Sequence, residues 1–189
     1  MFELMLTFFL LILFPVALFI IWKINSRKFI SSDTVASAYD AWTQDKLLER
    51  LWGEHIHLGF YPSGKKNIDF RKAKVQFVHE LVQWSGLNKL PKGSRILDIG
   101  CGIGGSSRIL AKYYGFHVTG ITISPAQVKR ARELTPPELN CNFQVMDALN
   151  LEFEDGLFDA VWSVEAGAHM CDKTRFADEM LRTLRPGGY

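Results

Sequence analysis

Histidine and glutamate side chains are the first candidates for proton transfer in this sequence. His55 and His57 stand two residues apart in an aromatic-rich segment, and Glu165 stands four residues before His169. An unperturbed histidine titrates near neutral pH, so it can take a proton from a hydroxyl group at working pH. Each histidine also has a structural alternative, in which it caps a loop carbonyl or packs against a neighbour. We predict that at least one of these four residues is catalytic.

A zinc site built from the same histidines is a weaker alternative. His55, His57 and His169 with Cys171 would supply four ligands, but the chain has neither a C-x-x-C nor an H-E-x-x-H spacing. We therefore predict no metal. The three cysteines cannot all pair, and they indicate reduced thiols rather than a disulfide framework.

A glycine-rich segment offers a ligand site. Gly100, Gly102 and Gly105 fit the dinucleotide-binding spacing G-x-G-x-x-G, and glycines in such a turn let the backbone approach a ligand beside a helix N-terminus. That fingerprint also requires an acidic residue about 20 residues further on, to hold a ribose. The sequence has Thr122 at the corresponding strand end and no acid before Glu133.

Asp98, two residues before Gly100, decides between the possible ligands. A carboxylate at this position would repel a pyrophosphate, but it would attract a ligand that carries an ammonium and a sulfonium group, as S-adenosylmethionine (SAM) does. We therefore favour SAM over a dinucleotide, and also over a tight turn that binds nothing.

Composition and charge limit the classes of protein to which the chain can belong. Its 189 residues suit one domain, and contents of 22% charged and 13% aromatic residues exclude a disordered or low-complexity chain. A net charge of +2 gives no basic excess of the kind that nucleic-acid binders carry. No nucleic-acid partner is therefore expected.

The N-terminal segment is apolar enough to cross a bilayer. Residues 4–22 carry no charge, and a helix of that length would extend about 28 Å, close to the thickness of a hydrocarbon core. A cleaved signal peptide is the alternative, but no basic residue precedes the apolar run and Trp22 ends it. Lys23, Arg27 and Lys28 follow, so the positive-inside rule places the rest of the chain on the cytoplasmic side. We predict one transmembrane anchor with its basic flank over residues 1–30.

Residues 31–93 have the pattern of a helical cap that covers a substrate region. Apolar residues recur at three- and four-residue spacing in 35–42 and again in 73–84, where Asp69 and Gly86 mark the start and the end of a helix. Residues 52–61 lack a clean period, and we predict an ordered loop there. The side chains predicted to wall a pocket are aromatic: Tyr39, Trp42, Trp52, Phe60 and Tyr61. Ordinary core packing is the alternative, and it is favoured for Trp42.

Residues 94–189 alternate strands with helices. The strands are predicted at 95–99, 117–123, 142–146 and 158–164. The helices are predicted from Ser106, from Pro125 and after Asp172, and Ser124 and Gln127 have the spacing of a capping box. The alternation predicts an α/β fold with a parallel sheet, right-handed crossovers and helices on both faces.

The C-terminal residues 185–189 are predicted to leave a helix and begin another strand. The fourth strand would then lie at an unpaired apolar edge, which natural sheets avoid. Truncation is the simplest account of this edge, and a partner chain that completes the sheet is the alternative.

The glycine segment and two later segments resemble the class I SAM-dependent methyltransferases. Residues 96–105 resemble motif I of that family, and residues 155–163 and 184–188 resemble its later motifs. More narrowly, the chain resembles the tocopherol and plastoquinone branch, which includes the cyanobacterial-type methyl-phytyl-benzoquinone (MPBQ/MSBQ) and the γ-tocopherol methyltransferases. The segments that carry this second likeness are 39–42, 52–61, 120–127 and 163–170, with the N-terminal apolar run.

The resemblance implies a Rossmann-like sheet of seven strands, of which this chain would supply the first four. It places Thr122 where many relatives carry an acid that binds the ribose, so weaker contacts are implied there. For Asp147, a solvated turn carboxylate is the alternative. The residues that the resemblance assigns to SAM are Asp98, Gly100, Gly102 and Gly104 for the methionine part, Thr122 and Gln127 for the ribose, and Asp147 and Ala148 for the adenine.

The resemblance further implies a SAM-dependent C-methyltransferase. Its acceptor would be a ring carbon of a prenylated benzoquinol or of a tocopherol precursor, in tocopherol and plastoquinone biosynthesis. A membrane tether agrees with this acceptor, because a prenyl tail partitions into a bilayer. A truncated SAM-binding module without turnover and a sterol-type C-methyltransferase are the alternatives. We expect a single-pass membrane protein of a cyanobacterial-type cell, with residues 94–189 as an incomplete SAM-binding domain on the cytoplasmic side.

Overall fold

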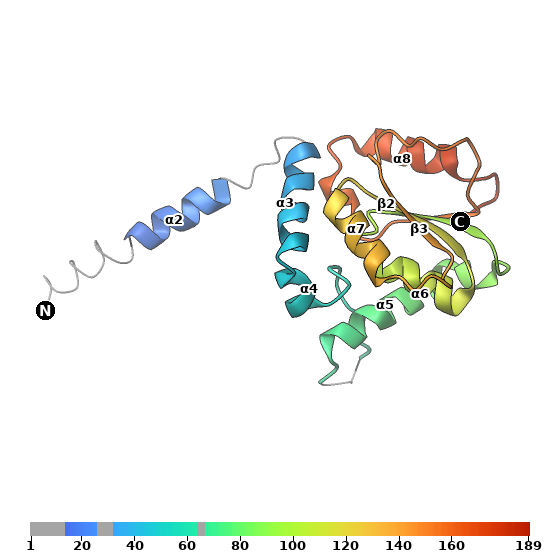
Figure 1. Cartoon of the computed structure of the whole chain (residues 1–189), viewed down its shortest axis with the longest axis horizontal. Helices are drawn as coiled ribbons and strands as arrows, with labels where there is room; N and C mark the ends of the chain where they lie inside the picture. Colours follow the sequence, from blue (N-terminus) through green and yellow to red (C-terminus); the bar gives the residue numbers. More distant parts are fainter. Residues whose placement is uncertain (1–13, 26–31, 64–66) are drawn as a thin grey trace, which may run out of the picture. The chain divides into compact units, whose positions relative to one another are not determined.

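Four parallel strands form the sheet on which the structure is built. The computed structural model describes residues 14–25, 32–63 and 67–189. The strands are β1 (Arg95–Ile99), β2 (His117–Thr122), β3 (Cys141–Val145) and β4 (Ala160–Trp162), in the order β3-β2-β1-β4 (Figure 1). The parallel α/β sheet predicted from the sequence is confirmed.

The strand order reverses between β1 and β4. From β1 the chain runs outward through β2 to β3, and it then crosses back to place β4 on the other side of β1. In open α/β sheets, ligands bind beyond the carboxyl ends of the strands at such a reversal. The segments that follow Ile99 and Trp162 are therefore the expected position of a site.

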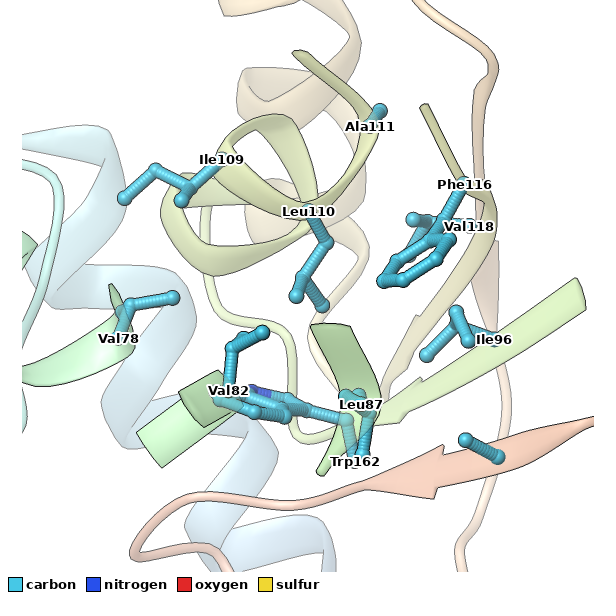
Figure 2. Close-up of a cluster of buried hydrophobic side chains, with 11 residues drawn as sticks. Val78, Val82, Leu87, Ile96, Ile109, Leu110, Ala111, Phe116, Val118 and Trp162 are labelled. Carbon is cyan, nitrogen blue, oxygen red and sulfur yellow. The ribbon is translucent and has the colours of Figure 1, made fainter. Parts of the chain in front are cut away.

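Three helices cover one face of the sheet. They are α5 (Phe70–Ser85), α6 (Gly105–Tyr114) and α7 (Pro125–Leu134). Figure 2 shows the apolar cluster beneath α5 and α6, where Val82 and Leu110 lie near Trp162 of β4 and Ile96 of β1. Under α7, Val128 and Ala131 pack with Phe143 of β3 in a smaller cluster.

The helix α8 (Lys173–Thr183) covers the opposite face, where Phe176 and Met180 pack on the cluster that contains Leu97 and Ile99 (Figure 1). Successive side chains of a strand point to opposite faces. Leu97 and Ile99 therefore face α8, and Asp98 faces α6. Asp98 is thus a single carboxylate in an otherwise apolar strand interior.

Side-chain caps set the starts of three helices where the sequence predicted them. Asp69, Ser124 and Asp172 each accept a hydrogen bond from a backbone N–H group in the first turn of α5, α7 and α8. Gly86 ends α5 in the left-handed conformation that favours glycine. The remaining elements are α4 (Leu47–Trp52), η2 (Leu87–Lys89) and η3 (Gly167–His169).

The outer edge of β4 is paired by the end of the chain itself. Phe158 N–H donates to Thr183 O and Arg185 N–H donates to Phe158 O, at 3.0 and 2.9 Å. Tyr189 then continues beside β4, because its carbonyl accepts from Val161 N–H at 3.0 Å. The expectation that the fourth strand would lie at an unpaired edge was wrong, since residues 184–189 satisfy backbone groups along it.

The chain divides into two compact units, residues 1–35 and 36–189. In the first, the structure describes α2 (Phe14–Asn25) and the first four residues of α3 (Ser32–Gln44). Of the predicted anchor and its basic flank, residues 1–13 and 26–30 lie outside the described residues. Over residues 14–25, 32–63 and 67–189, no helix combines the length and the apolar character needed to cross a membrane.

Candidate active site

Asp98 lies at the carboxyl end of β1 with 2% of its surface exposed. The Ser107 hydroxyl of α6 donates to Asp98 Oδ2 at 2.6 Å, and no ion pair to Asp98 occurs among the described residues. Burial raises the pKa of this carboxyl group to about 6, and the Ser107 hydrogen bond lowers it in part. A carboxylate that is buried without a cation is suited to a positively charged ligand.

The glycine segment leaves open space and brings two loops together. A Cβ atom on Gly102 would meet no atom within 4 Å, and its φ of +56° is one that glycine adopts without strain. A Cβ atom on Gly100 would collide with the Cβ atom of Ala166, in the loop after β4. The loops that follow β1 and β4 therefore meet at the reversal of strand order. The open cradle at Gly102 beside the unpaired Asp98 fits the methionine part of SAM.

Thr122 and Gln127, predicted to contact the ribose, contact each other. Thr122 Oγ1 donates to Gln127 Oε1 at 2.7 Å, and both side chains are buried. The predicted capping box is therefore half formed: Ser124 Oγ accepts from Gln127 N–H at 3.1 Å, but the Gln127 side chain does not return to Ser124. Ser124 N–H donates to Thr122 Oγ1 at 3.3 Å instead.

Asp40 contacts the start of α7, and the sequence reasoning missed this residue. It lies on α3, and its Oδ1 accepts from the Ser124 hydroxyl and, at 3.1 Å, from Ala126 N–H. These bonds fix α3 to the start of α7. No local pattern could have found them, because the partners lie 84 and 86 residues away.

The two residues predicted to reach the adenine have local contacts. Asp147 is exposed, and its Oδ1 accepts from Leu149 N–H at 2.9 Å, which is the geometry of the alternative, a turn carboxylate. Ala148 packs its side chain in the apolar cluster on the α8 side of the sheet. The backbone of Ala148 and the second carboxylate oxygen of Asp147 are the groups that could hold an adenine.

His55 and His57 form a buried pair. His57 Nδ1 lies 2.7 Å from Leu58 O, a group that can only accept, so Nδ1 carries the proton. His57 Nε2 then accepts from His55 Nδ1 at 3.1 Å. Burial lowers the pKa of His55 to about 3 and also lowers the pKa of His57, so both rings are neutral near pH 7.

Glu165 reaches the same loop from the other side of the site. Its Oε1 accepts from Leu58 N–H at 3.0 Å, which joins the loop after β4 to the His55–His57 loop. Glu165 has a φ of 57°, in the left-handed region that side chains other than glycine adopt rarely. Such strain is maintained only where the surroundings hold it, which is common at functional sites.

His169 contacts a different partner. Its Nε2 lies 3.0 Å from the Tyr39 hydroxyl of α3, and the two rings meet edge to face. Burial raises the pKa of Tyr39. The structure thus divides the four predicted catalytic residues into a His55–His57–Glu165 network, linked through Leu58, and a Tyr39–His169 pair.

Lys74 and Arg108 hold the His55–His57 loop in place, and the sequence reasoning missed both. Lys74 Nζ donates to His55 O at 2.7 Å and to Trp52 O at 3.2 Å. Arg108 of α6 forms an ion pair with Glu54 at 2.6 Å. Neither contact has a local sequence pattern, since each joins the loop to a separate helix.

The aromatic side chains predicted to wall a pocket are largely at the surface. Trp42 is 49% exposed and packs edge to face on Tyr39 at 5.4 Å, so the preference for ordinary core packing of Trp42 was wrong. Trp52, Phe60 and Tyr61 are also exposed. In the part of the chain that the structure describes, no three His, Cys, Asp or Glu residues are grouped to hold a metal ion.

Comparison with known proteins bears on the family of the chain. The family model described as a methyltransferase domain matches residues 96–188. The 2-methyl-6-phytyl-1,4-hydroquinone methyltransferase of Synechocystis sp. is 60% identical over 168 residues, which cover 89% of this chain and 53% of that protein. The chloroplastic tocopherol O-methyltransferase of Arabidopsis thaliana is 42% identical over 152 residues, 75% of this chain and 44% of that protein.

A solved structure shares the fold over most of the chain. The cyclase SpnF superimposes with a TM-score of 0.74 at 29% identity, covering 84% of this chain and 58% of SpnF. The chain spans about half the length of the curated relatives that it matches. Motif I on the reversal of strand order, the matched domain and the identity to these relatives together show that the chain belongs to the class I SAM-dependent methyltransferases.

Proposed function

We propose that the chain is the SAM-binding part of a C-methyltransferase that methylates a ring carbon of a prenylated benzoquinol, in tocopherol and plastoquinone biosynthesis. The observation that carries this proposal is the 60% identity to a 2-methyl-6-phytyl-1,4-hydroquinone methyltransferase over 89% of the chain. Two observations support the cofactor that this activity requires. Asp98 is buried without an ion-pair partner among the described residues, and the space beside Gly102 is open.

Asp98, Gly100, Gly102 and Gly104 would hold the methionine part of SAM. When bound, SAM supplies a methyl group on a sulfonium, with a neutral thioether as the leaving group. Asp98 contributes a negative charge in a site of low dielectric constant, where attraction to a cation is stronger than in water. The N-terminus of α6, beside the glycine segment, favours the carboxylate of the ligand.

The acceptor must lose a proton before its ring carbon can attack. We assign this proton to His169, which is exposed and is oriented by the Tyr39 hydroxyl. The O–H bond of the quinol breaks, the proton passes to His169, and the electron pair enters the ring. With SAM held by Asp98 and the glycine segment, the ring carbon would form a bond to the methyl carbon and the carbon–sulfur bond would break. That ring carbon then loses its proton to water, which restores aromaticity as a phenolate, and the phenolate oxygen takes the first proton back from His169.

His55, His57 and Glu165 have a different place in the proposed mechanism. The two imidazoles are neutral and hydrogen-bonded to each other, so they hold the loop rather than carry the proton. The Glu165 carboxylate accepts from Leu58 N–H and adds negative charge where a sulfonium would lie, beyond the end of β4. Assignment of catalytic roles among these residues remains a prediction.

A membrane tether belongs to the same proposal. The apolar residues 4–22 and the basic residues Lys23, Arg27 and Lys28 support a single span with residues 31–189 on the cytoplasmic side. A prenyl tail dissolves in the bilayer, so a tethered enzyme meets its acceptor at high local concentration.

A SAM-binding module without turnover is the second candidate function. The chain spans 53% of the Synechocystis relative, so part of an acceptor pocket can lie in residues beyond this sequence. Moreover, SpnF carries the same fold and is named a cyclase, so the fold does not determine the reaction.

One experiment separates these functions. The chain is placed in phospholipid vesicles that contain 2-methyl-6-phytyl-1,4-benzoquinol, and transfer of radiolabelled methyl from SAM is measured beside equilibrium binding of SAM. We expect both binding and transfer. Binding without transfer would leave the second candidate, and displacement by NAD but not by S-adenosylhomocysteine would contradict both.

A further inference from the structure

The face formed by α4 and the start of α5 carries exposed apolar side chains. Leu51, Trp52 and Phe70 are 54%, 48% and 40% exposed. The Trp52 and Phe70 rings meet edge to face with 6.4 Å between their centroids. Isolated apolar residues are normal on a surface, whereas contiguous exposed apolar groups are typical of interaction sites.

Basic side chains surround this apolar group. The Arg71 guanidinium lies 5.6 Å from the centre of the Phe70 ring. It also donates to the main-chain carbonyls of Arg50 and Leu51, so α4 is tied to α5. Arg50 and Lys72 are exposed on the same two elements.

The neighbouring carboxylates already have partners. Glu49 pairs with Arg130 at 2.7 Å, and Glu54 pairs with Arg108 at 2.6 Å. Asp69 is engaged as the cap of α5, where the helix N-terminus offsets its charge. The face formed by α4 and the start of α5 therefore presents uncompensated positive charge.

A pocket of about 610 Å³ opens beside this face, and further basic side chains line it. Trp52, Arg71, Lys74 and Lys112 are among its lining residues. Lys74 is 4% exposed and has no carboxylate within ion-pair distance among the described residues. Glu49 and Glu54 also line it, but each is paired with an arginine. The cations that remain beside the aromatic rim match a ligand with an anionic head and an apolar chain.

We propose that the face formed by α4 and the start of α5 docks on an anionic lipid bilayer, with Trp52 and Phe70 at the interface and lipid phosphates against Arg50, Arg71 and Lys72. Aromatic rings favour the headgroup level of a membrane, and basic side chains are attracted to anionic lipids. This inference rests on the proposed function, because the acceptor of that reaction is dissolved in the bilayer. Lys74 donates to the carbonyls of both Trp52 and His55, so one side chain joins this face to the loop of the site.

Quenching of tryptophan fluorescence tests the docking. The 189-residue chain is bound to vesicles of phosphatidylcholine with phosphatidylglycerol, with and without brominated acyl chains. The difference in emission between the wild type and W52F isolates Trp52, and we expect bromination to remove more than half of it. W84F isolates Trp84, which is 85% exposed on the far end of α5 and should keep its emission.

Charge reversal tests the anionic preference. Each basic residue at an anionic membrane surface raises the association constant about fivefold. The double variant R50E/K72E should therefore bind the vesicles weakly through this face and recover most of the Trp52 emission that bromination removes. The matched control K89E/K92E changes two exposed lysines beyond the C-terminal end of α5 and should leave the quenching intact. Equal quenching in pure phosphatidylcholine would overturn the preference for anionic lipid, and unquenched Trp52 would overturn the docking.

A second acceptor distinguishes failure of the docking from failure of the proposed function. Methyl transfer to a short-chain, water-soluble benzoquinol needs no docking, and R50E/K72E should leave it unchanged while slowing transfer to the vesicle-borne acceptor. Transfer to both acceptors without quenching of Trp52 would refute the docking alone. Quenching without transfer to either acceptor would support the docking and refute the proposed function.

Discussion

The Tyr39 hydroxyl lies 3.0 Å from His169 Nε2, across 130 residues of sequence. The bond joins α3 to the end of η3, which follows β4 at the reversal of strand order. Asp40, the next residue of α3, accepts hydrogen bonds from Ser124 and Ala126 in the segment after β2. One turn of α3 is therefore fixed to the loops after two different strands.

Replacement of His169 should affect turnover rather than cofactor binding. General acid–base catalysis contributes about 100-fold or more, so we expect H169A to lower kcat by about 100-fold. Y39F leaves the imidazole but removes its partner, and its effect should be about tenfold. Equilibrium binding of SAM should be unchanged in both variants.

Two matched substitutions control for this prediction. H117A changes an exposed histidine at the start of β2, and Y113F changes an exposed tyrosine on α6. Both should retain full turnover. An H169A variant with wild-type kcat would remove the Tyr39–His169 pair from the mechanism.

Neutralisation of Asp98 should weaken SAM binding. D98N keeps the shape of the side chain and an acceptor for the Ser107 hydroxyl, but it removes the charge that faces the cofactor. A hydrogen bond to a charged group is worth about 1.5–3 kcal/mol, so we expect the Kd for SAM to rise about 10- to 100-fold. The exposed Asp178 of α8, which has no part in the proposed site, provides the control D178N, for which no change is expected. Unchanged affinity in D98N would refute the site.

The same substitution should change how stability depends on pH. Burial raises the folded-state pKa of Asp98 to about 6, whereas an unfolded chain has about 3.9. The folded state therefore holds this proton more tightly, and the stability that it contributes is present below pH 4 and lost as the pH rises through 6. Two pKa units correspond to about 3 kcal/mol. Without ligand, D98N should be more stable than the wild type at pH 7.5 by up to this amount in urea unfolding. The difference should shrink towards pH 4, and parallel profiles would contradict the prediction.

The contact between Gly100 and Ala166 should be visible as a stability difference between two glycine substitutions. Gly93 has a φ of +84°, and a Cβ atom there would meet no atom within 4 Å, so G93A adds backbone strain of about 1–2 kcal/mol alone. G100A has similar strain and also drives a methyl group into Ala166. Chemical unfolding should therefore show a greater loss for G100A, and A166G should recover the excess. Equal losses in G93A and G100A would mean that the two loops do not meet.

Local sequence signals predicted the strands of the sheet and the starts of its helices. Asp69, Ser124 and Asp172 cap helices because a side-chain oxygen needs only the N–H groups of the next turn. The strand and glycines around Asp98 were found for the same reason, since their pattern is contiguous. The length of the fourth strand was overestimated, because the chain leaves the sheet after Trp162.

Contacts between distant segments account for what could not be predicted. The bonds of Tyr39 and Lys74 depend on how the helices before the sheet lie against it. The pairing of Tyr189 beside β4 likewise follows from the path after α8. None of these contacts has a repeating sequence pattern that could reveal it.

The His55–His57 pair should be neutral and fixed in one tautomeric arrangement. Leu58 O can only accept, so His57 is protonated at Nδ1, and His55 must then donate from its own Nδ1 to His57 Nε2. Burial lowers the pKa of His55 to about 3, below its ordinary value, so the stability that depends on its neutral form is present above pH 6.5 and lost as the pH falls towards 3. Long-range proton–nitrogen NMR spectra of the folded chain should show both rings in the Nδ1-protonated form, unchanged from pH 8 to pH 5, and H55A and H57A assign the signals. Either ring titrating near pH 6.5 would show that the pair is open to solvent, and would return His55 and His57 to the residues able to take the proton of the acceptor.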